Sequence, residues 1–254
     1  MEQALGDAYR SFDHSSAAGF VSARDLVEYC FRHPNVRAIS SHQAAPPPPK
    51  IFGREVFTSL LIRDPIARIR SVYAFERAQA KSTPGAIKAK ELTFKQYVEW
   101  RLETSPAVLC NFQVYFCSRT AANRSQVSGD EQLENAIKNL DGISLVGTVA
   151  RFDEWLALVQ KVLSSSFPNL ALASARQNAS LGCEPSKGEI LEQLISELGD
   201  ATARYLIQKN ELDMCLHQVA DALLTRRLAE HGAGLTLLQA YTSTQGDRSS
   251  SHRL

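Results

Sequence analysis

The sequence predicts an α/β fold in which a central parallel sheet is flanked by helices. Short β-branched and aliphatic runs occur in VRAIS (36–40), VFTSLLI (56–62) and SLVGTV (144–149). Their length and apolar content are typical of strands buried in a parallel sheet. Between these runs lie longer segments with apolar residues at helical spacing. Strands that alternate with helices indicate a layered fold around a parallel sheet.

The helices are predicted from capping residues and from apolar periodicity. Residues 1–33 are expected to be helical, with SARDLVEYCFRH behind a serine cap, and KSTPGAIKAK is expected to be a polar loop. The proline-rich stretch HQAAPPPPK is expected to be an extended loop. The other predicted helices are TFKQYVEWRLE behind Thr93, EQLENAIKNL, RFDEWLALVQKVL with Trp155, Leu158, Val159 and Val162 on one face, GEILEQLISELG, and ELDMCLHQVADALLTRRLAEH.

Length and composition limit the classes of protein that fit. The 254 residues are expected to form one domain over 1–240, followed by a polar, disordered tail over 241–254. Lys plus Arg is 28 and Asp plus Glu is 27, and this balance gives no support for nucleic-acid binding. The five cysteines are scattered and form no CxxC pair, which argues against a zinc site or a disulfide framework.

No apolar stretch is long enough to span a membrane, and the N-terminus lacks the basic and apolar regions of a signal peptide. A cytoplasmic protein without an integral membrane segment is therefore expected. The sequence also contains no GxGxxG, GxSxG, HExxH or kinase motif. Nicotinamide, serine-hydrolase and zinc-protease chemistry thus have no positive support. Nothing in the sequence indicates an oligomeric state.

The stretch SLLIRDPIARIRSVYAFER (59–77) predicts an anion site. Arg63 ends the strand, Asp64 can cap a helix, and Pro65 suits the first helical position. Free N–H groups at a helix N-terminus and an arginine fork both favour phosphate, and Ser71 two turns later can add a hydroxyl. The alternative is an ordinary strand-to-helix turn whose arginine is solvated or pairs with a nearby acid.

The segment IRDPIARIRSVYAF resembles the 3′-phosphate-binding segment of sulfotransferases that use 3′-phosphoadenosine 5′-phosphosulfate (PAPS). In that family an arginine at a strand end and a serine eight residues later hold the 3′-phosphate of the nucleotide. The resemblance therefore implies that Arg63 and Ser71 bind PAPS and its product 3′-phosphoadenosine 5′-phosphate (PAP).

Later segments resemble the carbohydrate-type sulfotransferases, including the uronyl 2-O-sulfotransferases, and the resemblance covers roughly residues 36–225. The similar segments are YVEWRL with NFQVYFCS, LVGTVARFDEWLALV, the basic loop RQNAS with Arg176, and the helix NELDMCLHQVADAL. The resemblance implies a P-loop-NTPase-like sulfotransferase fold that transfers a sulfuryl group to a hydroxyl, with a small-molecule or carbohydrate acceptor. It implies that Arg176 helps to close over the nucleotide, although a solvated surface arginine is the alternative.

His42 follows a predicted strand and lies 21 residues before Arg63. This position is similar to that of the histidine proposed as general base in the uronyl 2-O-sulfotransferases. Sulfuryl transfer resembles phosphoryl transfer and needs a base for the acceptor hydroxyl, a role that suits histidine. The alternative is a structural or solvent-exposed histidine.

One departure from the family stands at the front of the chain. The family has a lysine-containing phosphate loop after its first strand, whereas no lysine precedes Lys50 here. The first strand and the phosphate loop are therefore expected to be absent. Two explanations are open: the sequence starts downstream of a genuine loop, or the chain is a degenerate relative that binds a nucleotide or a partner without transferring sulfate.

Overall fold

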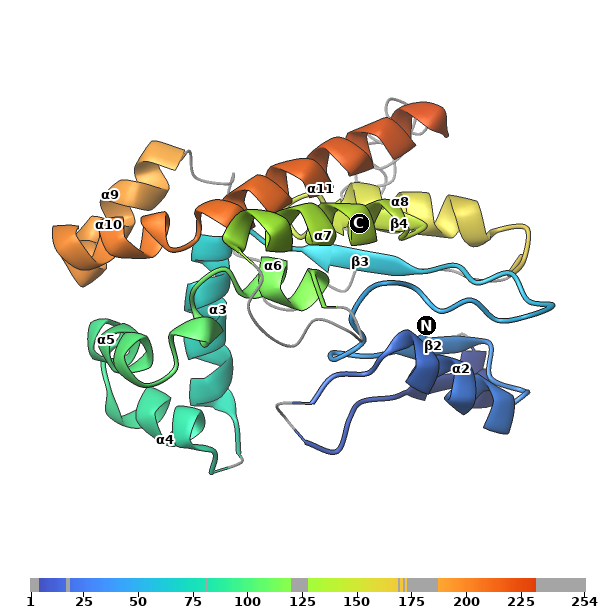
Figure 1. Cartoon of the computed structure of the whole chain (residues 1–254), viewed down its shortest axis with the longest axis horizontal. Helices are drawn as coiled ribbons and strands as arrows, with labels where there is room; N and C mark the ends of the chain where they lie inside the picture. Colours follow the sequence, from blue (N-terminus) through green and yellow to red (C-terminus); the bar gives the residue numbers. More distant parts are fainter. Residues whose placement is uncertain are drawn as a thin grey trace, which may run out of the picture.

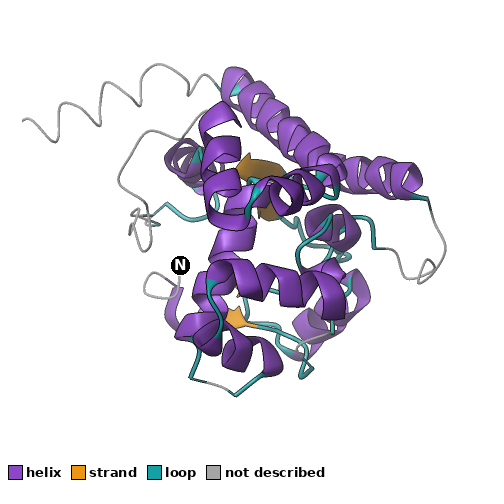
Figure 2. Ribbon diagram, turned by 90° about the vertical axis from the view of Figure 1, so that its left-hand side faces the viewer, coloured by secondary structure: helices purple, strands orange, loops and turns teal. Residues whose placement is uncertain are grey.

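The structure is a computed structural model that describes residues 5–16, 19–80, 82–119, 128–168, 170, 172 and 187–231. Within these residues the chain forms a helix-rich α/β fold with two short parallel sheets (Figure 1). Figure 2 shows that both strand pairs lie among helices. The mixed α/β class predicted from the sequence is confirmed.

The N-terminal segment contains the first strand pair. A 3-10 helix, η1 (Gly6–Ala8), leads into β1 (Tyr9–Ser11), and β1 pairs in parallel with β2 (Ala38–Ser40). Helix α2 (Ala23–Arg32) connects them and begins with a capping box made by Ser22 and Asp25. The predicted strand at 36–40 and the helix behind the serine cap are confirmed.

The prediction that residues 1–33 are helical and that no strand precedes the first helix is wrong, because β1 occupies residues 9–11. This strand has only three residues and none of them is buried, so it carries no apolar pattern that a sequence could reveal. It is fixed instead by tertiary contacts, including a 2.5 Å hydrogen bond between the hydroxyls of Tyr9 and Ser40.

The second pair consists of β3 (Ser59–Ile62) and β4 (Leu145–Thr148), which are parallel with Ile62 opposite Thr148. Both strands lie within the runs predicted from the sequence. Ile62 and Val146 pack against apolar side chains of α6 (Phe112–Cys117), α7 (Gly129–Asp141) and α11 (Glu211–Glu230). Leu145 packs with α8 (Phe152–Leu163), whose predicted apolar face contains Leu158 and Val159.

A single central sheet was predicted, but the described strands form two separate parallel pairs. The connection between β2 and β3 runs over residues 41–58 and contains four consecutive prolines, 46–49. Proline has no N–H group to donate to a strand ladder, so the four prolines cannot take part in a strand that would join the two pairs.

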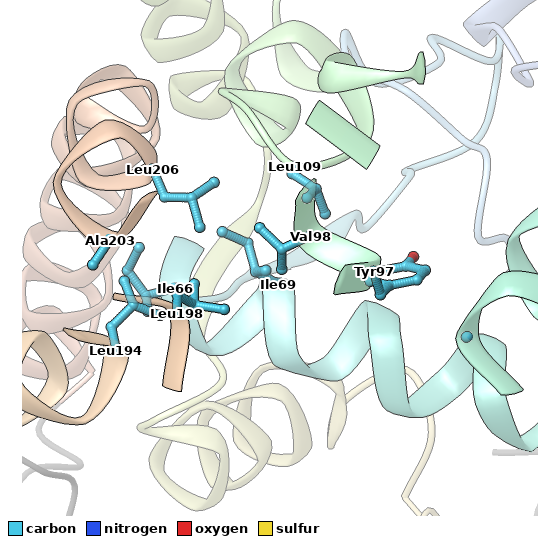
Figure 3. Close-up of a cluster of buried hydrophobic side chains, with 10 residues drawn as sticks. Ile66, Ile69, Tyr97, Val98, Leu109, Leu194, Leu198, Ala203 and Leu206 are labelled. Atoms are coloured by element: carbon cyan, nitrogen blue, oxygen red, sulfur yellow. The ribbon is translucent and has the colours of Figure 1, made fainter. Parts of the chain in front are cut away.

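The remaining helices build a core around α3 (Pro65–Ala78). Figure 3 shows Ile66 and Ile69 of α3 packed among side chains from the neighbouring helices. These helices are α5 (Phe94–Thr104), α9 (Lys187–Leu198) and α10 (Asp200–Gln208), with η2 (Pro106–Val108) next to them. The caps predicted for α3 and α5, Asp64 and Thr93, are both observed.

The prediction of a polar loop at KSTPGAIKAK is wrong, because α4 (Pro84–Glu91) forms there. Thr83 caps this helix by accepting a hydrogen bond from the backbone of Ala86, and Pro84 stands at the first position. These are ordinary helix-start signals. The segment is polar overall, but Gly85, Ala86 and Ala89 are buried in the structure.

Three predictions fall on other parts of the chain. The polar tail at 241–254, the domain boundary at residue 240 and Arg176 lie outside the described residues. Among the helices that the structure describes, none has the length and apolar character needed to cross a lipid bilayer.

Candidate functional site

The connection from β3 to α3 places Arg63 at a sharp corner. Ile62 ends the strand in the core, and Asp64 caps the helix by accepting a 2.8 Å hydrogen bond from the backbone N–H of Ala67. Pro65 occupies the first helical position. The sequence-predicted strand-to-helix turn is therefore confirmed, and Arg63 lies between the end of β3 and the start of α3.

Arg63 and Ser71, the two residues predicted to bind phosphate, are in contact with each other. The Nη1 group of Arg63 donates a 2.8 Å hydrogen bond to Oγ of Ser71, and both side chains are half-buried. Within the described residues, no carboxylate lies within 4.0 Å of the Arg63 guanidinium. Four of its five N–H groups thus have no hydrogen-bond acceptor in the described part of the protein. We call these two side chains the Arg63 corner.

The backbone of Arg63 is held by Gln113 from α6. The amide oxygen of Gln113 accepts from Arg63 N at 2.9 Å, and its Nε2 donates to the Arg63 carbonyl at 2.8 Å. Asp213 of α11 in turn accepts from the backbone N–H groups of Gln113 and Val114, at 3.0 and 2.7 Å. Segments about 50 and 150 residues away in the sequence therefore fix the position of Arg63.

A second arginine lies in the electrostatic environment of the Arg63 corner. Burial lowers the pKa of Arg68 to about 10; the carboxylate of Asp213 partly offsets this, and the positive charge of Arg63 adds to it. The Arg68 guanidinium donates to the carbonyl of Val108 at 2.8 Å and lies 3.8 Å from the centre of the Phe112 ring. Two cations close enough to repel each other favour the binding of an anion between or beside them.

His42 is placed elsewhere, at the end of β2. Its Nδ1 lies 3.1 Å from Oδ2 of Asp13, and its side chain is 91% exposed. Among the described residues, no hydrogen bond or ion pair joins His42 to Arg63 or Ser71. The structure thus brings the two predicted phosphate-binding residues together and pairs the predicted base with a carboxylate that was not predicted.

Three residues with a part in this arrangement were missed in the sequence: Asp13, Gln113 and Asp213. Gln113 and Asp213 lie in segments that resemble sulfotransferases, but their contacts to the Arg63 backbone and to α6 depend on the tertiary fold. Asp13 follows β1, and that strand was not recognised. A residue just after a parallel strand is a common place for function, so the strand itself was the missing signal.

A shallow, mainly apolar depression between α7 and α11 shares no residue with the Arg63 corner or with His42. It is lined by Glu134, Ile137, Lys138, Asp141, Val219 and Leu223. Among the described residues, no cluster of three or more histidine, cysteine or acidic side chains could hold a metal ion. Within the described residues, the Arg63 corner and the Asp13–His42 contact each lie just after the carboxyl end of a strand.

Comparison with known proteins shows a similarity to an archaeal protein. The chain is 24% identical over 225 residues to an uncharacterized protein of Archaeoglobus fulgidus, and the match covers 85% of this chain and 87% of that protein. No protein-family model matches the sequence. No solved structure matches the chain. The resemblance to sulfotransferases rests on IRDPIARIRSVYAF and the later similar segments of the sequence, and it stays a prediction.

Proposed function

We propose that this protein is sulfotransferase-like and binds the 3′-phosphate of PAPS or PAP at the Arg63 corner. The observation that supports the proposal is the 2.8 Å contact from Arg63 to Ser71, made by an arginine that has no carboxylate partner in the described residues. An arginine fork next to a serine hydroxyl offers several donors to a single phosphate.

The carboxylate of Asp64 shapes how an anion would be recognised here. It already accepts a hydrogen bond from the first turn of α3, so the N–H groups of that turn are partly used. Recognition of the phosphate therefore falls to the side chains of Arg63 and Ser71, with the charge of Arg68 as additional support. Side-chain recognition of this kind suits a phosphate monoester, such as the 3′-phosphate, that lies beside α3.

In the proposed reaction, PAPS and a carbohydrate hydroxyl are the substrates, and His42 is the candidate base. The acceptor oxygen forms a bond to sulfur while the bond from sulfur to the bridging phosphate oxygen breaks, and the bond's electron pair leaves with PAP. The proton of the hydroxyl passes to the imidazole of His42. Positioning and positive charge supply most of the catalysis in transfers of this type.

The second candidate is a nucleotide-binding or partner-binding module with the same Arg63 corner and no transfer activity. The absence of any lysine before Lys50 favours it, because the loop after β1 then has no lysine to hold the 5′-phosphosulfate. A nucleotide-binding module differs from the enzyme only in whether sulfate is transferred, whereas a module that binds only a partner protein differs from it already in nucleotide binding.

Calorimetric titration with PAP tests the shared part of the proposal, with adenosine 5′-monophosphate (AMP) as the matched control that lacks the 3′-phosphate. Selective binding of PAP is expected. Equal affinity for the two nucleotides, or binding of neither, would contradict the proposal. Transfer of labelled sulfate from PAPS to a panel of carbohydrates then separates the enzyme from the binding module.

A further inference from the structure

Asp13 and His42 lie side by side at the carboxyl ends of two parallel strands. Ser11 of β1 stands opposite Ser40 of β2, and Asp13 and His42 each come two residues later. This is the edge of a parallel sheet at which loops bring functional side chains together. The pair comes from residues 29 positions apart, so it is made by the strand pairing and not by local sequence.

The carboxylate of Asp13 accepts three hydrogen bonds from the β2 side. Its Oδ1 accepts from the backbone N–H of His42 at 2.7 Å and from the hydroxyl of Ser41 at 2.9 Å. Its Oδ2 faces Nδ1 of His42 at 3.1 Å. The two bonds to Oδ1 hold the carboxylate in place relative to the β2 backbone. Because the carboxylate is held, the contact between Oδ2 and Nδ1 sets the direction of the imidazole ring.

The charge state of Asp13 determines which ring nitrogen carries the proton. Burial is the largest single influence and raises the pKa of Asp13, but the hydrogen bonds from His42 and Ser41 together outweigh it, so the pKa lies below the usual value of 3.8. An ionised carboxylate can only accept hydrogen bonds. In a neutral His42, the proton must therefore be on Nδ1, and Nε2 is the nitrogen with the free lone pair.

We infer that Asp13 is a positioning residue that holds His42 in the Nδ1–H tautomer and presents Nε2 to the solvent as a proton acceptor. The 91% exposed side chain of His42 leaves Nε2 accessible to an approaching hydroxyl group. When Nε2 takes a proton, Nδ1 still carries its own proton and keeps facing the Asp13 carboxylate at 3.1 Å, so the ring keeps its direction.

The role of this pair in sulfuryl transfer rests on the proposed function, whereas the orientation of His42 does not. The inference differs from a purely structural role, in which Asp13 would only join the ends of β1 and β2. A structural contact requires the carboxylate and the backbone N–H of His42, but it sets neither the tautomer nor the reactivity of the ring.

Nitrogen-15 NMR of the imidazole rings tests the orientation directly in the full chain. At a pH above that of histidine protonation, His42 is expected to show Nδ1–H and a free Nε2 in the wild type. The same pattern is expected in Ser41→Ala, which removes a different hydrogen bond to the same carboxylate. It should be lost in Asp13→Asn. An Nε2–H tautomer in the wild-type protein would overturn the inference, whatever the variants do.

Acylation by diethyl pyrocarbonate, followed residue by residue, measures the reactivity of Nε2 without any substrate. His231 is exposed, and its ring has no hydrogen-bond partner among the described residues, so it serves as an internal reference. His42 is expected to react several-fold faster than His231 in the wild type and in Ser41→Ala, and at a similar rate in Asp13→Asn. Equal rates in the wild type, or no effect of Asp13→Asn, would overturn the inference.

These measurements separate the two proposals. An oriented, reactive His42 in a protein that does not distinguish PAP from AMP would support the Asp13–His42 pair and contradict the proposed nucleotide site. Selective PAP binding with an unoriented His42 would support the nucleotide site and overturn the pair. In Asp13→Asn, the preference for PAP over AMP is expected to be unchanged, because Asp13 makes no contact with Arg63 or Ser71 in the described structure.

Discussion

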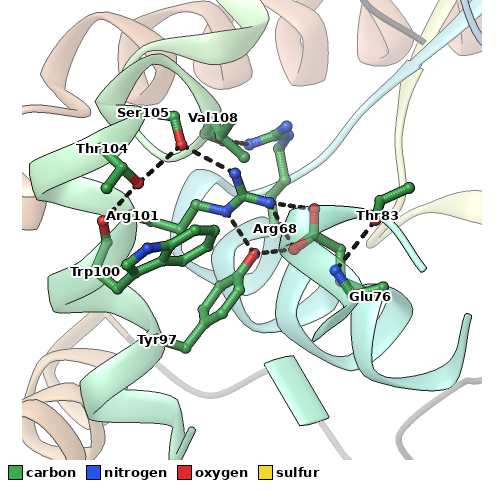
Figure 4. Close-up of polar contacts among 10 residues, drawn as sticks. Arg68, Glu76, Thr83, Tyr97, Trp100, Arg101, Thr104, Ser105 and Val108 are labelled. Carbon is green, nitrogen blue, oxygen red and sulfur yellow. Dashed lines mark hydrogen bonds and ion pairs between the residues drawn. The ribbon is translucent and has the colours of Figure 1, made fainter. Parts of the chain in front are cut away.

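The two halves of helix α3 hold arginine side chains in opposite ways. At its start, Arg63 donates a single side-chain hydrogen bond to Ser71 and has no carboxylate partner among the described residues. Toward its end, Glu76 meets Arg101 and Tyr97 of α5 in a network that we call the Glu76 cluster (Figure 4). Arg101 is paired with an acid inside the fold, whereas Arg63 keeps N–H groups without an acceptor among the described residues.

In the Glu76 cluster, the guanidinium of Arg101 has hydrogen bonds from all three of its nitrogens. Nη2 contacts both oxygens of Glu76 at 2.5 and 2.7 Å, Nε donates to the Tyr97 hydroxyl at 3.0 Å, and Nη1 donates to Ser105 at 2.9 Å. Burial lowers the pKa of Arg101, but the bonds to Glu76 and Tyr97 outweigh it and raise the pKa above the ordinary value. This arginine is matched by an acid, so its role is structural.

The comparison first predicts a large effect on stability at the Glu76 cluster. Glu76→Ala leaves the charge of Arg101, which is only 9% exposed, without its carboxylate. Breaking a buried ion pair by removing one partner typically costs about 3 to 5 kcal/mol. Urea unfolding followed by circular dichroism measures the loss.

Glu197→Ala is the matched control, because Glu197 pairs with Arg70 at a site where both side chains are about one-third exposed. A pair of that kind is worth about 1 kcal/mol or less. If the two variants lose the same amount of stability, the Glu76 cluster stabilises the fold no more than a surface ion pair does.

A second prediction concerns the space next to the cluster. A Cβ at Gly85 would overlap Nη2 of Arg101 and Oε2 of Glu76. Gly85→Ala is therefore expected to destabilise the fold by about 1 to 3 kcal/mol, as overpacking does. Gly129→Ala is the control, since the nearest atom there is a leucine methyl 3.1 Å away and alanine favours a helix over glycine. A stable Gly85→Ala variant would show that the cluster can move.

The smallest predicted effect lies at the Arg63 corner. Ser71→Ala removes one hydroxyl from the proposed phosphate contacts and is expected to weaken PAP binding by about 1 kcal/mol, roughly fivefold. Ser71→Thr keeps the hydroxyl and should bind PAP nearly as well as the wild type. Calorimetry measures both. A Ser71→Ala variant with unchanged PAP affinity would exclude this hydroxyl from the site.

Much of the architecture could be predicted from the sequence because local signals decide it. Asp64 and Pro65 start α3 by their own chemistry, and the apolar runs at 56–62 and 144–149 form the strands β3 and β4. The resemblance named Arg63 and Ser71 as partners at one phosphate, and in the structure the long Arg63 side chain reaches Ser71 on α3.

Other features depend on contacts between distant residues and left no local pattern. Strand β1 is three residues long and unburied, and it exists through its pairing with β2. The Asp13–His42 contact follows from that pairing, so it was missed together with the strand. Gln113 contacts the backbone of Arg63, and Asp213 contacts the backbone of α6. Hydrogen bonds of this kind leave no periodic pattern in the sequence.

The most direct test of the central claim compares PAP with AMP in the wild type and in Arg63→Ala. The wild type should prefer PAP, and Arg63→Ala should lose about 1.5 to 3 kcal/mol of that preference, roughly ten-fold to over a hundred-fold in affinity, while its unfolding curve stays close to the wild type. This result would mean that Arg63 binds the 3′-phosphate. The same preference for PAP in both proteins would contradict the proposal that Arg63 binds the 3′-phosphate. Arg63 would then be an ordinary arginine at a strand-to-helix turn.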